Sequence, residues 1–239
     1  LWKGFMDAAG DNMDFYSIHL YDWSSMGEDP KQGSTFRGGM TTEAILDMVE
    51  WYDAQVNGKE NLKPWVVSEY GAITSGGATV PFLQNDYRYA DWLHIRTFNQ
   101  MFMQLLTRPS QIVKSMPFVP VKARWGAYAS GDDVVRYEPS LLQSDAGADT
   151  FFTDESEWFI SDKVQWYQLW SDVKGTRVDT HSNDPDVQVD AYVDGNHTYL
   201  ILNNLEWYDI PVDLSFMGAD SNTVKSVNMK HSYLAEGLS

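Results

Sequence analysis

The chain has 239 residues and a formal net charge of −17, from 34 acidic and 17 basic side chains. Such a surface repels phosphate groups, so we expect neither nucleic acid nor an anionic membrane as a partner. The absence of cysteine excludes disulfides, thiol catalysis and thiolate metal sites. Ten tryptophans and thirteen tyrosines exceed what the core needs, so some rings should be exposed for ligand contact.

Three short apolar stretches alternate with two helical patterns in the first half of the chain. The stretches are rich in aromatic and β-branched residues, and the segments between them place apolar residues at helical spacing. Strands that alternate with long helices are typical of βαβ units in a parallel α/β sheet. We predict strands at 13–21, 65–68 and 113–119, and helices at about 42–56 and 86–106.

The remainder of this α/β part is less regular. Residues 121–156 form a long irregular segment, and long loops in compact domains are usually functional or mobile. A helix is predicted at 157–173. Three βα units cannot close a barrel, and an open sheet of three strands leaves a hydrophobic edge. We therefore expect the chain to be an interior piece of a longer protein.

Beyond Gly175 the pattern changes to alternation of apolar and polar residues. The turn Asp194-Gly195-Asn196 lies between two alternating runs, which predicts a β-hairpin. Further alternating runs at 210–216 and 224–229 predict two more strands. We expect an antiparallel β-sandwich module at 183–239, truncated at its end, after an α/β domain at 1–182.

Glu69 follows the second predicted strand, within Trp-Val-Val-Ser-Glu-Tyr-Gly at 65–71. The carboxyl ends of strands face the active site in an eight-stranded barrel. A carboxylate there can be the nucleophile of a retaining glycosidase, with a partner acid about 5–5.5 Å away. On the local string alone, a loop glutamate that caps a helix or pairs with an arginine is an equal alternative.

His19 and Tyr21 stand at the end of the first predicted strand. Side chains two residues apart share one face of a strand, so both point the same way. They are candidates to hydrogen-bond a sugar hydroxyl or to position Glu69. A histidine satisfied within the core is the alternative for His19.

Aromatic residues near strand ends are candidates for sugar contact. Trp23 lies just after the first strand and Trp125 shortly after the third, and indole rings stack on the apolar faces of pyranose sugars. The alternative is that both wedge between loops as peripheral core. Tyr70, directly after Glu69, is a further candidate for substrate contact.

Positive charges are scarce in this chain, which makes those near predicted loop ends informative. Arg37 is a candidate substrate contact. Together with Lys122 and Arg124 it either neutralises buried carboxylates or contacts a sulfated polysaccharide. The sequence lacks a phosphate-binding loop, a Ser-His-Asp order and a zinc motif, and the acidic clusters lack the full spacing of a calcium loop. We therefore expect no cofactor and no metal.

These residues resemble clan A of the glycoside hydrolases. Asp-Phe-Tyr-Ser-Ile-His-Leu-Tyr-Asp-Trp at 14–23 and the string at 65–71 look like strands six and seven of its (β/α)8 TIM barrel. The resemblance implies that Glu69 is the nucleophile and that the third strand, with Trp125, is strand eight. The acid/base glutamate of this clan ends strand four, and no such strand precedes residue 14. The resemblance therefore implies that this chain alone is inactive.

Within the clan, the chain is most similar to glycoside hydrolase family 86. The similarity is carried by Ser-Glu-Tyr-Gly at 68–71, Leu-Trp-Ser-Asp-Val-Lys-Gly-Thr-Arg-Val at 169–178 and Asn-Asn-Leu at 203–205. It implies a retaining, endo-acting β-agarase or β-porphyranase, with β-sandwich domains after the barrel. It also implies a red-algal galactan as substrate and a place outside the bacterial cell, on its surface or in the periplasm.

Two alternatives remain open at the level of sequence. One is a non-catalytic carbohydrate-binding protein built from a degenerate barrel and a β module. The other is a clan A glycosidase with a different substrate, such as a β-galactosidase.

Overall fold

The computed structural model describes residues 1–23, 38–73, 87–206, 208–217 and 224–234. The chain divides into two compact units, Leu1–Trp166 and Tyr167–Ser239, each with its own main sheet. Within the described residues, no helix combines the length and the apolar character that crossing a bilayer requires.

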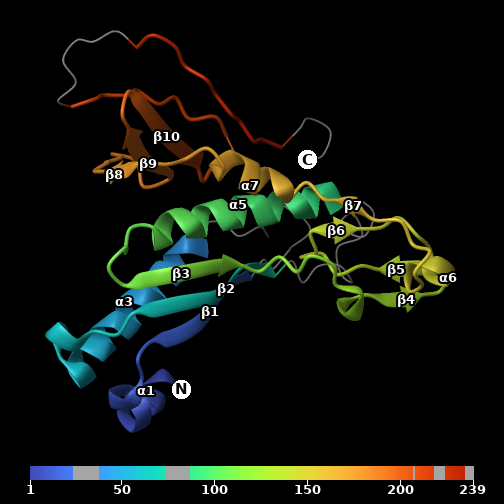
Figure 1. The fold of residues 1–239 in the computed structure, drawn as a ribbon, viewed down its shortest axis with the longest axis horizontal. Helices are drawn as coiled ribbons and strands as arrows, with labels where there is room; N and C mark the ends of the chain where they lie inside the picture. Colours follow the sequence, from blue (N-terminus) through green and yellow to red (C-terminus); the bar gives the residue numbers. More distant parts are fainter. Residues whose placement is uncertain (24–37, 74–86, 207, 218–223, 235–239) are drawn as a thin grey trace. The chain divides into compact units, whose positions relative to one another are not determined.

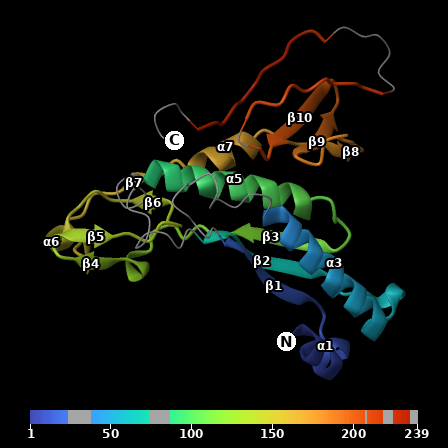
Figure 2. The ribbon, with the colours of Figure 1, turned by 180° about the vertical axis from the view of Figure 1, so that it is seen from behind.

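A three-stranded parallel sheet in the order β1-β2-β3 organises the first unit. Helix α3 follows β1 and helix α5 follows β2, and Figures 1 and 2 show them from the two sides. Because the two helices contact each other as well as the sheet, they cover the same face. The predicted strands and helices are confirmed with shifted ends: β1 (Tyr16–Trp23), β2 (Trp65–Ile73), β3 (Ile112–Pro117), α3 (Gly38–Asn57) and α5 (Tyr87–Leu105).

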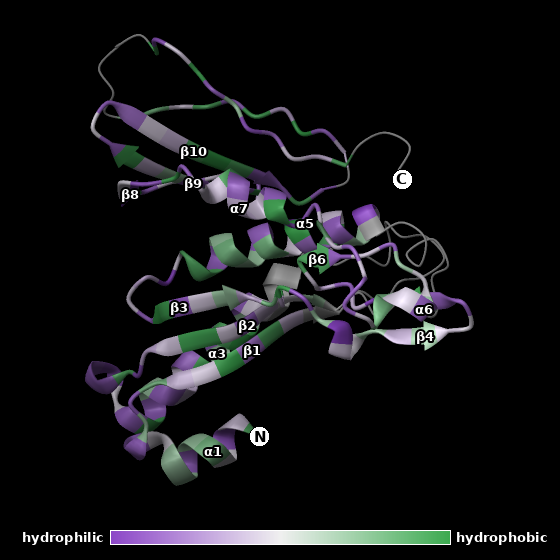
Figure 3. Ribbon diagram, turned by 45° about the vertical axis from the view of Figure 1, so that its right-hand side comes forward, coloured by the Kyte–Doolittle hydropathy of each residue, from purple (hydrophilic) through white to green (hydrophobic). Residues whose placement is uncertain are grey.

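Every second residue of β1 is buried on the helix-covered face, as for Tyr16, Ile18 and Leu20. Tyr16 shows which face this is, because its hydroxyl donates to Asp53 of α3 over 3.1 Å. The residues in between point to the opposite face of the sheet. In Figure 3 this appears as green stretches along β1 and β2, interrupted by polar positions.

The rest of the first unit is built from short elements. Helices α1 (Trp2–Ala9) and η1 (Gly10–Asn12) precede β1, and η2 (Lys59–Asn61) precedes β2. The segment predicted to be irregular contains the turn η3 (Arg124–Gly126) and the short helix α6 (Ala148–Phe151). It also takes part in two small antiparallel ribbons, β4 (Tyr128–Ser130) with β5 (Asp133–Val135), and β6 (Leu142–Gln143) with β7 (Phe159–Ile160), which follows the segment.

The helix predicted at 157–173 is shorter in the structure, where α7 spans Val164–Trp170. The prediction of its start was wrong because Phe159 and Ile160 pair with β6 as a strand. The Asp91 carboxylate then accepts the backbone N–H of Asp162 over 2.9 Å, just before the helix begins.

The second unit contains an antiparallel sheet in the order β10-β9-β8. The predicted hairpin is confirmed as β9 (Val187–Asp194) and β10 (His197–Asn204), with Gly195 at a positive φ of 59° in the turn. Strand β8 (Thr176–Val178) pairs with β9, although it precedes the domain boundary predicted at 182–183. That boundary stays a prediction.

The two further strands predicted in this unit were wrong. The described parts of the runs, 210–216 and 224–229, form no strand, and side chains such as Val227 and Met229 are about four-fifths exposed, at 80% and 81%. Alternation predicts a strand only where a neighbouring strand accepts its backbone hydrogen bonds. No described strand pairs with these runs.

Candidate active site

The structure brings Glu69, Tyr21 and His19 together on the face of the sheet that α3 and α5 leave open. The Tyr21 hydroxyl donates to Glu69 Oε2 over 2.6 Å, and His19 Nδ1 lies 3.2 Å from the same oxygen. Among the described residues no contact is made to Oε1. The Glu69 side chain is 32% exposed, so it is held by its neighbours and still open to a ligand. We call these three residues the strand-end site, after the predicted position of Glu69, although β2 continues to Ile73 and Glu69 lies inside it.

A β-bulge determines which way Glu69 points. Ile18 pairs with Val67, but the next residue, His19, pairs with Glu69, so β2 carries one extra residue at Ser68. Simple alternation would have placed Glu69 on the same face as the buried Val67. The extra residue reverses the alternation and turns Glu69 to the side of His19.

Burial and the neighbouring carboxylate keep Tyr21 protonated. Its pKa is raised, first by burial and then by the hydrogen bond to Glu69 and the charge of Glu69. A phenol that stays neutral is a permanent donor at neutral pH. Tyr21 can therefore hold one oxygen of the Glu69 carboxylate in place through a permanent hydrogen bond.

Two aromatic residues that were not predicted extend the site. The ring of Phe118 lies 5.9 Å from that of Tyr21, and the ring of Tyr137 lies 6.4 Å from that of Phe118, both edge to face. The pKa of Tyr137 is raised by burial and by the negative charge of Glu69. Phe118 lay in the predicted third strand. Tyr137 lay in the segment predicted to be irregular, where no sequence pattern marked it as a site residue.

Trp125 joins this row, and its role as a sugar contact stays a prediction. Its ring centroid is 4.8 Å from that of Tyr137, and 71% of the residue is exposed. An indole with a partner beneath it and an open surface suits stacking against a sugar ring. The row from Tyr21 through Phe118 and Tyr137 to Trp125 is called the aromatic row below.

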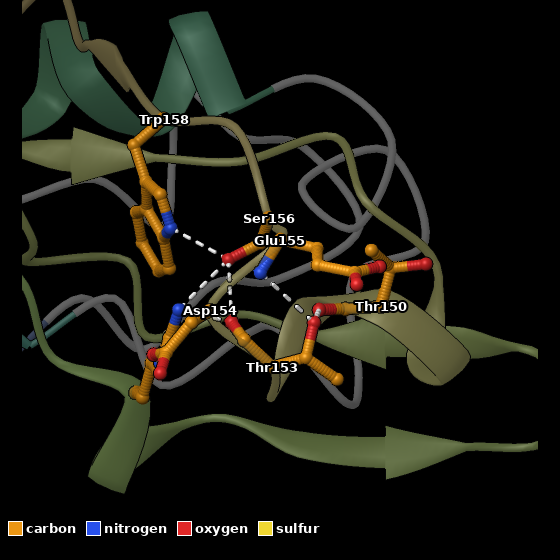
Figure 4. A network of polar contacts seen from close by, with 7 residues as sticks. Thr150, Thr153, Asp154, Glu155, Ser156 and Trp158 are labelled. Carbon is orange, nitrogen blue, oxygen red and sulfur yellow. Dashed lines mark hydrogen bonds and ion pairs between the residues drawn. The ribbon is translucent and has the colours of Figure 1, made fainter.

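A polar network fixes the turn that carries Trp125 (Figure 4). Arg124 donates to Ser156 Oγ over 2.9 Å and to the carbonyl of Thr153, and it forms an ion pair with Asp154 at 3.4 Å. The indole N–H of Trp158 donates to Ser156 Oγ over 2.8 Å. The Asp154 side chain is fully exposed, so Arg124 pairs with a surface carboxylate and not with a buried one as predicted, and its other two bonds anchor η3.

Lys122 uses an aromatic ring instead of a carboxylate. Its Nζ lies 4.3 Å from the centroid of the Trp158 ring, a cation–π contact. The Arg124 guanidinium lies 5.5 Å from the same ring. Trp158 is thus held from several sides.

The other predicted contacts have different outcomes. Tyr70 is completely buried and packs edge to face on Phe98 of α5, at 6.1 Å, so its prediction as a substrate contact is corrected. The bulge that exposes Glu69 turns the next residue inward. Trp23 ends β1, but its side chain lies outside the described residues, and so does the whole of Arg37.

A second group of ionisable side chains lies between α5 and the start of α7. Lys163 pairs with Asp91 Oδ1, and their side chains are 0% and 2% exposed. Burial raises the pKa of Asp91 and lowers that of Lys163. Burial also raises the pKa of Glu138, which feels both charges, to about 7. No described group of three or more His, Asp or Glu side chains could hold a metal ion.

Comparison with known proteins adds the family. The model described as "Porphyranase beta-sandwich domain 1" matches residues 186–239. The chain is 43% identical over 238 residues to the β-agarase AgaO of Microbulbifer thermotolerans and 40% identical over 237 residues to a funoran endo-β-hydrolase of Wenyingzhuangia aestuarii. It resembles the crystal structure of BuGH86 in complex with neoagarooctaose, with a TM-score of 0.67 and 35% identity over 86% of the chain.

The resemblance to glycoside hydrolase family 86 is confirmed. Its relatives are β-agarases and β-porphyranases. The matches cover 97% of this chain but only 19% of AgaO, and 96% of this chain but only 29% of the funoran hydrolase. They cover 31% of the BuGH86 chain. This chain therefore corresponds to a minor part of family 86 proteins.

Proposed function

We propose that this chain supplies the nucleophile and part of the sugar-binding surface of a retaining, endo-acting hydrolase of red-algal galactans. The observation that carries the proposal is the carboxylate of Glu69, which Tyr21 and His19 contact through one oxygen while no described residue contacts the other. The activity belongs to the longer protein in which this chain lies. Relatives named β-agarase, funoran endo-β-hydrolase and β-porphyranase support a galactan as substrate.

The reaction proceeds in two displacement steps. Glu69 attacks the anomeric carbon and forms a glycosyl ester, while a second carboxylic acid protonates the departing glycosidic oxygen. That acid then acts as a base toward water, which cleaves the ester and restores Glu69. By the family resemblance, the acid/base residue ends a strand upstream of residue 14, outside this chain.

The architecture proposed with this function is the last part of a (β/α)8 barrel followed by a β-sandwich. In this proposal β1, β2 and β3 are strands six, seven and eight. The parallel sheet with α3 and α5 on one face supports it, because barrel helices all lie outside and the strand ends form the site. The match of 186–239 to a β-sandwich model supports the second module.

We place the protein outside the cytoplasm of a bacterium, where it meets its substrate. A galactan polymer is too large to cross a membrane intact, so the first cleavage has to occur outside the cell, on its surface or in the periplasm. The named relatives come from bacteria such as Microbulbifer thermotolerans.

Substitution of Glu69 in the full-length protein tests the role of the carboxylate. Glu69→Gln keeps the shape but removes the nucleophile, so turnover of agarose, porphyran and funoran should disappear while the circular dichroism spectrum is retained. Glu43→Gln, an exposed glutamate of α3, is the matched control and should keep full activity. Near-normal activity of Glu69→Gln rejects the assignment.

A second variant distinguishes a nucleophile from a general base. In Glu69→Ala, added azide should occupy the vacated space and give a glycosyl azide, with partial recovery of bond cleavage. Failure of azide to form this product argues against a covalent intermediate on Glu69. A wild-type protein that binds galactans without cleaving them indicates the carbohydrate-binding alternative, and release of single terminal galactose residues indicates a β-galactosidase.

A further inference from the structure

Gly126 lies so close to the ring of Tyr137 that a residue with a Cβ atom does not fit at this position. A Cβ atom at Gly126 would lie 2.4 Å from both Cγ and Cδ2 of Tyr137, and 2.9 Å from its Cβ. Real Cβ contacts are essentially never shorter than 3.0 Å. Gly126 does not have a positive φ, so the reason for a glycine here is steric and not conformational.

The Tyr137 ring and backbone are held from several other directions. Trp125 contacts the ring from the adjacent position in η3, at 4.8 Å, and Phe118 contacts it edge to face at 6.4 Å. The carbonyl of Tyr137 accepts the backbone N–H of Ser140 at 3.1 Å and the side-chain amide of Gln143 at 3.4 Å. Gln143 is only 2% exposed, so this support is part of the core.

A ring held this firmly, yet only half-buried, presents a defined surface toward the strand-end site. We propose that Tyr137 is a substrate-contacting residue that forms the wall of the sugar-binding surface beside Glu69, and that Gly126 is the positioning residue that lets its ring stand there. The ligand is the galactan, through the apolar C–H face of a pyranose ring. This inference rests on the proposed function, because it assigns a sugar to the neighbourhood of Glu69.

The chemistry of the wall fits a galactose ring. One face of a galactopyranose carries several C–H groups, which pack on an aromatic ring, while its hydroxyls need polar partners. Tyr137 offers both, a phenolic hydroxyl and a ring that Gly126 leaves room for and that is joined to Tyr21 through Phe118. Trp125 continues the same surface away from the carboxylate with its exposed indole.

A double-mutant cycle in the full-length protein tests the proposal. The four proteins are wild type, Gly126→Ala, Tyr137→Ala and the double variant, assayed for kcat and KM on neoagarooctaose. Tyr137→Ala should lower kcat/KM about tenfold, the equivalent of about 1.4 kcal/mol of lost stacking. Gly126→Ala should cause a similar loss by displacing the ring, and it should add little once Tyr137 is alanine, because the 2.4 Å contacts with the ring are then gone and only the 2.9 Å contact with the retained Cβ is left.

Two further variants separate contact from structure. Tyr137→Phe keeps the ring and should retain most of the affinity, which a loss of folding would not allow. Gly4→Ala, in α1 with nothing within 4 Å of the new Cβ, is the matched glycine control and should behave as wild type. Wild-type kcat/KM in Tyr137→Ala, or additive losses in the double variant, overturns the proposal, whatever the melting temperatures.

Binding measurements distinguish this inference from the proposed function. In the Glu69→Gln background, calorimetry with neoagarooctaose should show binding that weakens about tenfold on Tyr137→Ala. If the wild-type protein binds neoagarooctaose but never hydrolyses it, and Tyr137→Ala weakens this binding about tenfold, the proposed hydrolase activity is overturned and the role of Tyr137 in sugar binding is supported. If the wild-type protein is active and Tyr137→Ala binds as tightly as before, only the role of Tyr137 is overturned. If no variant binds, both the proposed function and the role of Tyr137 are overturned.

Discussion

Two carboxylates of the first unit, Glu69 and Asp91, have opposite environments. Glu69 is 32% exposed and receives both of its described contacts on one oxygen, whereas the Asp91 side chain is 2% exposed and uses both oxygens. Asp91 pairs with Lys163 and holds the start of α7 to α5. Among the described residues Glu69 keeps one oxygen without a contact, as the proposed nucleophile requires, whereas Asp91 uses both oxygens within the fold.

The largest expected effect comes from breaking the buried pair of Asp91 and Lys163. Lys163→Met leaves the Asp91 carboxylate buried without its cation, and we expect a loss of about 3–5 kcal/mol in the free energy of unfolding. Urea denaturation measures it. Lys114→Met, at an exposed position of β3, is the control and should change stability by less than about 0.5 kcal/mol.

A double variant sharpens this test. Asp91→Leu combined with Lys163→Met removes both charges, so it should recover most of the lost stability. If Lys163→Met alone costs less than about 1 kcal/mol, the pair does not hold the fold together and the contrast with Glu69 fails.

The strand-end site should respond in the opposite way, in activity and not in stability. Tyr21→Phe removes the hydroxyl that donates to Glu69 but keeps the ring that packs on Phe118. We expect kcat on agarose to fall about 10-fold to 100-fold, because an oriented carboxylate becomes free to turn. Steady-state kinetics of the full-length protein measure it.

The control and the contradicting result are simple to define. Tyr128→Phe, an exposed tyrosine of β4, should leave both kcat and stability unchanged. A large drop in melting temperature in Tyr21→Phe, with kcat per folded molecule retained, would assign Tyr21 to the fold and not to the site.

The spacing of apolar residues and the turn residues correctly predicted the helices and strands that depend on them. The parallel strands, α3, α5 and the hairpin at Gly195 followed from periodicity and turn residues, because these depend on neighbours in sequence. The prediction that Glu69 follows the second strand was wrong, because β2 continues to Ile73 and Glu69 lies inside it. Its direction was not predicted either, since simple alternation puts it beside Val67 on the buried face, and only the pairing with β1 reveals the bulge at Ser68.

Contacts between segments that are distant in the chain could not be predicted from the sequence. Tyr137 reaches the site because Gly126, Phe118 and Gln143 hold it, and nothing in its own neighbourhood of the chain marks it as functional. The strands predicted at 210–216 and 224–229 failed for a related reason. Their alternation specifies a strand, but pairing depends on a partner that the pattern does not name.

The smallest expected effect concerns the pH dependence of the buried group. Burial raises the pKa of Glu138 from an ordinary 4.5 to about 7. Between these values the folded protein keeps a proton that the unfolded chain has released, so the contribution of Glu138 is greatest below pH 4.5 and is lost as the pH rises through about 7. Glu138→Gln cannot ionise and lacks this loss.

The stability of Glu138→Gln relative to wild type should therefore rise by about 1–2 kcal/mol between pH 5 and pH 8. Urea denaturation at the two pH values measures it. The pKa of His94 is lowered by burial and by Lys163, so the contribution of His94 to stability rises with pH, whereas that of Glu138 falls. His94 is present in both proteins, so its contribution cancels in the difference. A difference that stays constant with pH contradicts a neutral Glu138 beside Lys163, and an ionised Glu138 would then offset the buried lysine together with Asp91.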